Sequence, residues 1–192
     1  MTDQDLIRAY VDSQDVDSLG TFLGRHQDSL VRFVSNFLRD DNVAQDIVQE
    51  TFLRVARHPT RLLRVSSCHN WLLRVARNLS VDYLRGAVRR RKHAKQFAEL
   101  RAADDRAREG SLAEPADLRL ERAEVRQRVE REIHRLSPRL RELTLLKVQE
   151  GKTYREIAEI TGLSVTNVGY LLHQAMKTLT ERLRDIRGER GR

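Results

Sequence analysis

The stretch TYREIAEITGLSVTNVGYLLHQAMKTL, residues 153–179, predicts two helices joined by a tight turn. Thr153 and Glu156 have the spacing of a capping box, in which each side chain bonds the other residue's backbone N–H. Gly162 follows the apolar positions of the first helix, and glycine takes the positive φ of a turn without steric cost. Ser164 is the predicted N-cap of the second helix. Together these signals indicate a helix-turn-helix.

The second helix of this stretch has an apolar face and a polar face. Helical spacing predicts that the apolar face packs into a core and comprises Val165, Val168, Leu172, Ala175, Met176 and Leu179. The polar face carries Thr166, Asn167, Tyr170, His173, Gln174 and Lys177. Such a face is what a recognition helix presents to base edges in DNA. The alternative is an ordinary helical hairpin with a solvated outer face.

The composition bounds the class of protein. The 192-residue chain has 33% charged and 5% aromatic residues and three prolines, which favours an all-α protein with modest cores. The single cysteine excludes an internal disulfide and a cysteine-rich zinc site. No apolar run is long enough for a transmembrane helix, and the N-terminus lacks the pattern of a signal peptide. We therefore expect a soluble cytoplasmic protein without membrane insertion.

The net charge of +8 is distributed unevenly along the chain. Residues 1–60 carry a net charge of −4 and residues 61–101 a net charge of +9. Residues 102–132 carry −2 and residues 133–192 carry +5. Two basic blocks separated by a mildly acidic stretch are typical of a chain with two nucleic-acid-binding surfaces.

The chain divides at residues 102–118, where Gly-Ser and Glu-Pro pairs interrupt a charged segment. We expect a flexible linker there, between two small helical domains over residues 1–101 and 119–187, the second containing the helix-turn-helix. In the first domain, apolar spacing predicts helices over residues 3–13 and 16–38 and a third after Asp40 or Asp41. Residues 60–70 are predicted to be a loop before a helix that begins at Trp71. In the second domain, Ser137 is a predicted N-cap and Gly151 a predicted C-cap.

The third helix carries Asp46, Gln49 and Glu50 on one face, apart from its apolar stripe. A solvated face is the simplest interpretation, and an electrostatic docking surface for a protein partner is the functional alternative. A metal-dependent nuclease using Asp46 and Glu50 is a remote third hypothesis, because no histidine or glycine-rich loop accompanies the carboxylates. The sequence contains no phosphate-binding loop or nucleophile with a base, so we expect no catalytic residues, no metal and no cofactor.

The helix beginning at Trp71 has a polar face of arginine and asparagine and leads into a basic run, residues 89–92. The polar face comprises Arg74, Arg77, Asn78, Asp82 and Arg85. Arginine contacts with phosphate give affinity that falls with salt, and the preceding polar loop is suited to an unstacked base. Trp71 is either a stacking platform for a base or a core residue. A basic run of this kind is also often only a solvated segment.

Three motifs in order along the chain resemble bacterial sigma factors of the small, extracytoplasmic-function (ECF) type. DNVAQDIVQETFLRV (residues 41–55) resembles the helix that grips the clamp of core RNA polymerase. WLLRVARNLSVDYLR (residues 71–85) resembles the segment that melts and binds the minus-ten promoter element. LSPRLRELTLLKVQEG (residues 136–151) with the helix-turn-helix resembles the domain that binds the minus-thirty-five element.

The resemblance implies a sigma factor that acts in transcription initiation by binding, with core RNA polymerase, promoter DNA and an anti-sigma factor as partners. It assigns Asp46, Gln49 and Glu50 to the polymerase. It places Asp82 and Arg85 at or behind the minus-ten surface, where they alternatively brace their own helix. The minus-ten residues it implies are Ser66, Asn70, Trp71, Arg74, Arg77, Asn78 and Arg85. The minus-thirty-five residues are Thr153, Tyr154, Arg155, Thr166, Asn167, Tyr170, His173 and Lys177.

One departure from the family concerns the recognition helix. Its usual basic positions are occupied here by Gly169, Leu171 and Gln174, so we expect a shallower salt dependence for this domain. Gly169 either lets the backbone approach DNA or is simply tolerated. The rival hypothesis is a free-standing helix-turn-helix regulator that binds duplex DNA without a polymerase.

Overall fold

The computed structural model describes residues 1–98 and 119–188, and every regular element in those ranges is helical. The elements are α1 (Asp3–Ser13), α2 (Val16–Leu38), α3 (Asp41–Arg57), the 3-10 helix η1 (Pro59–Arg64), α4 (Cys68–Ala98), α5 (Arg119–His134), α6 (Pro138–Val148), α7 (Tyr154–Thr161) and α8 (Val165–Gly188). The predicted all-α class is thus confirmed for the described residues. The predicted linker, residues 102–118, lies outside them.

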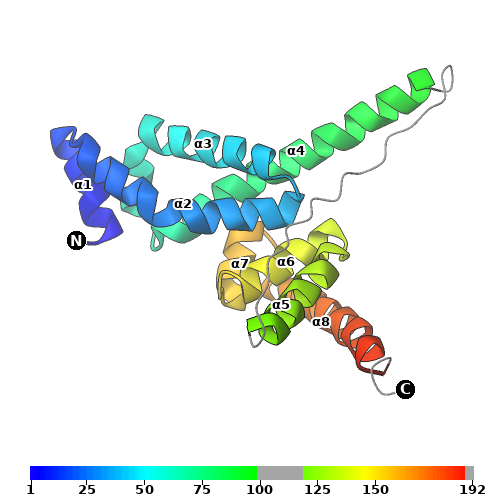
Figure 1. Ribbon diagram of the computed structural model, residues 1–192. Helices are drawn as coiled ribbons and strands as arrows, with labels where there is room; N and C mark the ends of the chain where they lie inside the picture. Colours follow the sequence, from blue (N-terminus) through cyan, green and yellow to red (C-terminus); the bar gives the residue numbers. More distant parts are fainter. Residues whose placement is uncertain (99–118, 189–192) are drawn as a thin grey trace.

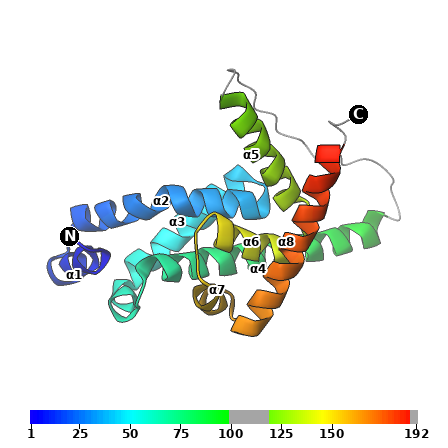
Figure 2. The same cartoon turned by 90° about the horizontal axis from the view of Figure 1, so that it is seen from below.

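The helices form two bundles, α1–α4 and α5–α8, and the second half of α4 extends beyond the first bundle (Figure 1). Contacts between the bundles are made by α4 with α7 and by α2 with α6, and Figure 2 shows α7 lying alongside α4. None of the described helices combines the length and apolarity needed to cross a bilayer.

The N-terminal bundle is built around α2, whose aromatic residues recur at helical spacing. Phe22, Phe33 and Phe37 are at most 2% exposed and pack with Leu30 and Val34. Burial of each such side chain contributes about 1.5–3 kcal/mol. Asp15 caps α2 by accepting from the N–H groups of Asp17 and Ser18, and Asp40 caps α3. The predicted bounds of α1 and α2 are confirmed.

Two boundaries in the N-terminal bundle differ from the prediction. Residues 60–70 are not a loop throughout, because η1 occupies Pro59–Arg64 and α4 begins at Cys68 rather than at Trp71. Leu62 of η1 is fully buried, and η1 packs against α1 and α3, so tertiary packing fixes a segment that lacks helical periodicity. Ser67 caps the start of α4, since its hydroxyl accepts from the N–H of Asn70 and its carbonyl from the N–H of Trp71.

Cys68, the chain's one cysteine, lies inside this bundle. Its thiol is 3.9 Å from the carbonyl oxygen of Leu62. Burial raises the pKa of the Cys68 thiol to about 11, with the nearby Asp3 carboxylate adding to the effect. The thiol is therefore protonated at neutral pH.

The helix-turn-helix has the predicted capping. Thr153 and Glu156 complete the capping box, Gly162 has φ 74°, and the hydroxyl of Ser164 accepts from the N–H of Asn167 at 3.2 Å. Ser137 occupies the predicted N-cap position of α6, before Pro138, but its side chain makes no cap bond. The prediction of Gly151 as C-cap was wrong, because α6 ends at Val148 with Gln149 as C-cap, and Gly151 (φ 64°) belongs to the following turn.

The buried stripe of α8 comprises Val168, Leu172, Ala175 and Leu179. The prediction that Val165 and Met176 also face the core was wrong, because they are 46% and 49% exposed. Val165 is the first residue of α8, at the end of the stripe. Met176 lies about 70° from the centre of the stripe, at its edge, and is left partly exposed there.

We predict that Gly162→Ala lowers the free energy of unfolding by about 1 kcal/mol, since a Cβ is strained at φ 74° although open space surrounds it. Gly24→Ala is the matched control. Gly24 lies within α2 with nothing within 4 Å of an added Cβ, so alanine there should stabilise by up to about 1 kcal/mol. Urea denaturation followed by circular dichroism measures both, and equal effects of the two substitutions would contradict this account of the turn.

Candidate nucleic-acid interface

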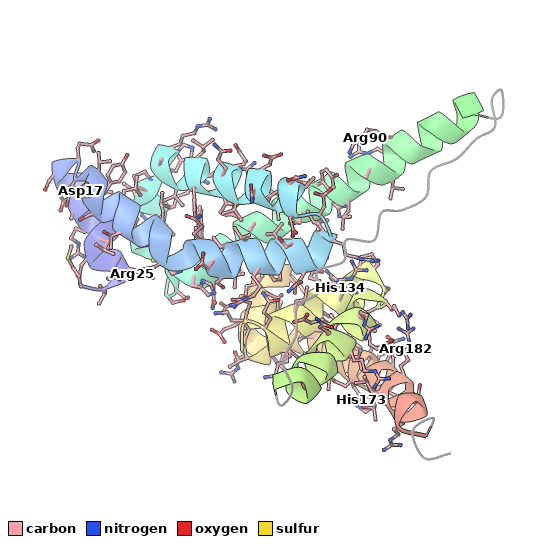
Figure 3. All side chains as sticks on the ribbon, in the orientation of Figure 1. Asp17, Arg25, Arg90, His134, His173 and Arg182 are labelled. Atoms are coloured by element: carbon pink, nitrogen blue, oxygen red, sulfur yellow. The ribbon has the colours of Figure 1, made fainter. Side chains whose placement is uncertain are left out.

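The outer face of α8 presents five of the residues predicted to contact DNA. Thr166, Asn167, Tyr170, His173 and Lys177 are all exposed, and Tyr170 is the most exposed aromatic residue described, at 68%. Figure 3 shows His173 on α8 in the C-terminal bundle. Because none of these side chains belongs to the buried stripe, the outer face of α8 can bind a ligand without disturbing the packing of the helix.

The start of α7 continues this surface. Thr153, Tyr154 and Arg155 are exposed. The ammonium group of Lys147 lies 5.4 Å from the centroid of the Tyr154 ring, a cation–π contact. A Cβ added at Gly169 would lie 3.6 Å from Cε2 of Tyr154, an ordinary contact distance. Gly169 therefore faces the Tyr154 ring, and alanine would fit in its place.

The residues predicted to bind the minus-ten element do not share one exposed face. Ser66, Arg74, Asn78 and Arg85 are exposed, and Arg85 pairs with Asp82 at 3.4 Å. Trp71 is half-buried against the N-terminal core, so it is neither a fully free platform nor a fully buried residue. Figure 3 shows Arg90 further along α4, on the part that extends beyond the bundle.

Asn70 and Arg77, two of these residues, face carboxylates of the C-terminal bundle. The amide nitrogen of Asn70 donates to Glu156 at 3.0 Å, and the guanidinium of Arg77 pairs with Glu142. The Asn70 bond and the capping bonds from Thr153 lower the pKa of Glu156 to about 2, so this carboxyl is charged. Asn70 is 6% exposed, and its buried carboxamide oxygen has no hydrogen-bond partner among the described residues.

Further side-chain bonds join the bundles. Ser29 donates to Glu150 at 2.7 Å, and the amide of Asn36 donates to Gln149 at 2.8 Å. Sequence reasoning missed this interface. Its partners stand 65 to 121 residues apart, and no local pattern marks them.

The acidic face predicted on α3 is accessible. Asp46 and Gln49 are exposed, and Glu50 is half-buried, with its carboxylate 3.0 Å from the guanidinium of Arg54. A pair this exposed contributes at most about 1 kcal/mol, so the carboxylate remains free to exchange partners. Among the described residues, no group of three or more His, Cys, Asp or Glu side chains is arranged to hold a metal ion.

Comparison with protein families matches both bundles. The family model "Sigma-70 region 2" matches residues 22–90, and the model "Sigma-70, region 4" matches residues 126–179. The chain is 28% identical over 189 residues to the ECF RNA polymerase sigma-E factor of Escherichia coli K12, covering 97% of this chain and 96% of that one. It is 27% identical over 173 residues to the RNA polymerase sigma factor CarQ of Myxococcus xanthus, covering 90% and 91%.

A third relative is longer than this chain. The ECF RNA polymerase sigma factor SigI of Mycobacterium tuberculosis is 29% identical over 156 residues, which cover 81% of this chain but 52% of SigI. This chain thus matches about half the length of SigI.

Two solved structures share the fold. The sigma factor RpoE of Bartonella quintana, solved with the anti-sigma factor NepR, has a TM-score of 0.62 at 21% identity and covers 86% of this chain and 96% of its own. CnrH, solved with the cytosolic domain of CnrY, has a TM-score of 0.63 at 22% identity and covers 95% and 97%. With both sigma-70 regions matched in order and relatives of the ECF type along nearly its whole length, the chain belongs to the sigma-70 family of RNA polymerase sigma factors, in the ECF group.

Proposed function

We propose that this protein binds core RNA polymerase and directs it to promoters, acting in the bacterial cytoplasm. The observation that carries the proposal is the presence of both sigma-70 regions, each with an exposed charged or polar face. The protein acts by binding, and the polymerase supplies the chemistry.

The proposed division of labour follows the exposed faces. Asp46, Gln49 and Glu50 on α3 contact the polymerase. The minus-ten element is bound by Ser66, which precedes α4, and by the α4 face with Trp71, Arg74, Asn78 and Arg85, joined by Asn70 and Arg77. The α7–α8 surface, with Thr153, Tyr154, Arg155, Thr166, Asn167, Tyr170, His173 and Lys177, binds the minus-thirty-five element. We propose residues 102–118 as the linker between the domains, 1–101 and 119–187.

Asn70 and Arg77 are freed for DNA when the bundles separate, because Glu156 accepts from the Asn70 amide and Glu142 from Nε of Arg77 in this arrangement. The carboxylates take the place that phosphate or base oxygens would take. The described arrangement is thus a closed form, and promoter binding requires an open one.

We also propose control by an anti-sigma factor. The support is that the structure of Bartonella RpoE is a complex with one, NepR, and that CnrH was solved with the cytosolic domain of CnrY. The free-standing regulator is not favoured, since such a protein has no need of the N-terminal domain matched by sigma-70 region 2.

The decisive experiment is transcription in vitro with purified core polymerase and a genomic template library. We expect transcripts that begin at a shared promoter motif only when the protein is added. Duplex binding with no effect on polymerase would favour the free-standing regulator instead.

Glu50→Lys tests the polymerase surface. We expect at least a tenfold loss of transcription, because the reversed charge repels a basic partner and also breaks the pair with Arg54. Asp12→Lys, an equal charge reversal at an exposed position of α1, should have little effect. Pull-down of core polymerase measures the loss directly, and equal binding by the two variants would refute the assignment.

A further inference from the structure

Four titratable side chains form a continuous chain between the two bundles. The carboxylate of Asp3 lies 2.8 Å from Nε2 of His26. Nδ1 of His26 lies 3.2 Å from Nδ1 of His69, and the two rings stack with centroids 5.3 Å apart. Nε2 of His69 lies 3.0 Å from the carboxylate of Glu150, the only member contributed by the C-terminal bundle.

Counting the hydrogens on the two rings shows which protonation state gives every contact among these four side chains a donor. Each carboxylate accepts from an Nε2–H group, and the bond between the two Nδ1 atoms needs one hydrogen, so three hydrogens fill three bonds. Two neutral imidazoles carry only two hydrogens and leave one contact without a donor. Two imidazolium rings carry four and bring two Nδ1–H groups face to face at 3.2 Å. The contacts are complete with one imidazolium.

The environment assigns that proton to His69. Burial lowers the pKa of His26, and the opposing effect of the Asp3 carboxylate is smaller, so His26 is the neutral ring. For Glu150, burial acts to raise the pKa, but bonds from His69, Ser29 and Gln149 outweigh it and lower the value. Glu150 is therefore a carboxylate, and His69 bonds it as the imidazolium.

We propose that His26 and His69 form a proton-dependent latch between the two bundles. The bundles stay together through Glu150 when the two rings carry one extra proton between them, and they separate when that proton is lost or a second is gained. This goes beyond promoter recognition. One consequence rests on the proposed function: release frees Asn70 and Arg77 for DNA.

The direction of the pH response follows from the proton count. The ordinary pKa of a histidine is about 6.5, and this value sets the scale for an open form in which Glu150 no longer contacts His69. Well above that pH, closing must take up a proton, and well below it closing must release one. Closure is therefore strongest near pH 6.5 and weakens on either side, by up to about tenfold per pH unit.

The buried ring of His26 also predicts that closure weakens at acidic pH. A histidine with a lowered pKa stabilises the closed form above its ordinary value and loses that contribution as the pH falls. The charged groups around the pair are Asp3 from α1, Arg25 from α2 and Glu150 from the turn after α6. Arg25 pairs with Asp3 at 3.3 Å and also opposes protonation of His26.

The test is energy transfer between dyes on the full chain carrying Thr21→Cys on α2 and Glu181→Cys on α8, both exposed positions. The native Cys68 thiol is buried and protonated, so a maleimide dye labels the introduced cysteines. Titration from pH 5 to pH 8.5, in chelator and at constant salt, should give highest transfer near pH 6.5. The closed-to-open ratio should fall about eightfold at pH 5 and about 25-fold at pH 8.5.

Two variants separate the latch from general acid or base effects. His69→Gln keeps an amide that can donate to Glu150 but does not titrate, so closure should no longer weaken on the alkaline side and should weaken only on the acid side, through His26. His26→Gln leaves His69 alone, so closure should weaken only on the alkaline side. His58→Gln, an exposed histidine after α3, should follow the unmodified profile. Circular dichroism across the range checks the helices. A flat profile in the parent chain, or the same peak in His69→Gln, overturns the latch without bearing on transcription by the protein.

Discussion

Arg141→Met is expected to lower the free energy of unfolding of the C-terminal bundle by about 3 kcal/mol. The reason is that its guanidinium group donates hydrogen bonds to three backbone carbonyl groups. Its Nη2 donates to His134 at 2.8 Å and to Leu136 at 3.2 Å, where α5 ends. Its Nη1 donates to the carbonyl of Phe37 in the N-terminal bundle at 3.0 Å. Methionine fills a similar volume but leaves all three acceptors without a donor.

Urea denaturation of the full chain measures the loss. Burial lowers the pKa of Arg141, and Arg39 adds to that effect, so some desolvation cost is recovered when the charge is removed. Arg155→Met, at an exposed position of α7, is the matched control and should change stability by less than about 0.5 kcal/mol. If the Arg141 variant lost no more than the control, the three bonds would contribute nothing net.

Glu142→Gln is expected to weaken closure of the bundles by about 2 kcal/mol, roughly a thirtyfold change in the closed-to-open ratio. Glu142 is 2% exposed and accepts from Arg77 across the interface and from Arg139 on its own helix, at 3.0 Å. The amide keeps the shape of the carboxyl group but loses its charge, and its nitrogen repels one of the two guanidinium groups.

The same dye pair reports this change at fixed pH. Arg139→Gln removes only the contact within α6 and should leave the transfer efficiency nearly unchanged. Asp82→Asn breaks an exposed pair with Arg85 and should do the same. If the closed-to-open ratio were the same in Glu142→Gln as in the unmodified protein, the pair between Arg77 and Glu142 would not hold the bundles together.

The elements of the fold were largely predictable because local signals determine them. The bounds of α2 follow from apolar residues at three- and four-residue steps, and the helix-turn-helix follows from Thr153, Gly162 and Ser164. The errors occurred where periodicity is weak, as in η1, or where position along the helix matters, as for Val165.

The interface was not predictable, because its energy comes from pairs distant in sequence. Arg77 was identified as a phosphate contact from its helix face, and nothing near it indicates that Glu142 would occupy it. His26 and His69 showed no pattern at all, since each acquires its neighbour only through packing of α2 against α4. The assignment of individual residues to polymerase and promoter remains a prediction.

The buried cysteine has a consequence for the signals that this protein can receive. With a pKa of about 11, Cys68 has a thiolate fraction of about one in ten thousand at neutral pH, and peroxides react with the thiolate. Because the chain has no second cysteine, it cannot form an internal disulfide. Oxidation of Cys68 by peroxide is therefore slow in the folded protein, and this cysteine is poorly suited to sense oxidants directly.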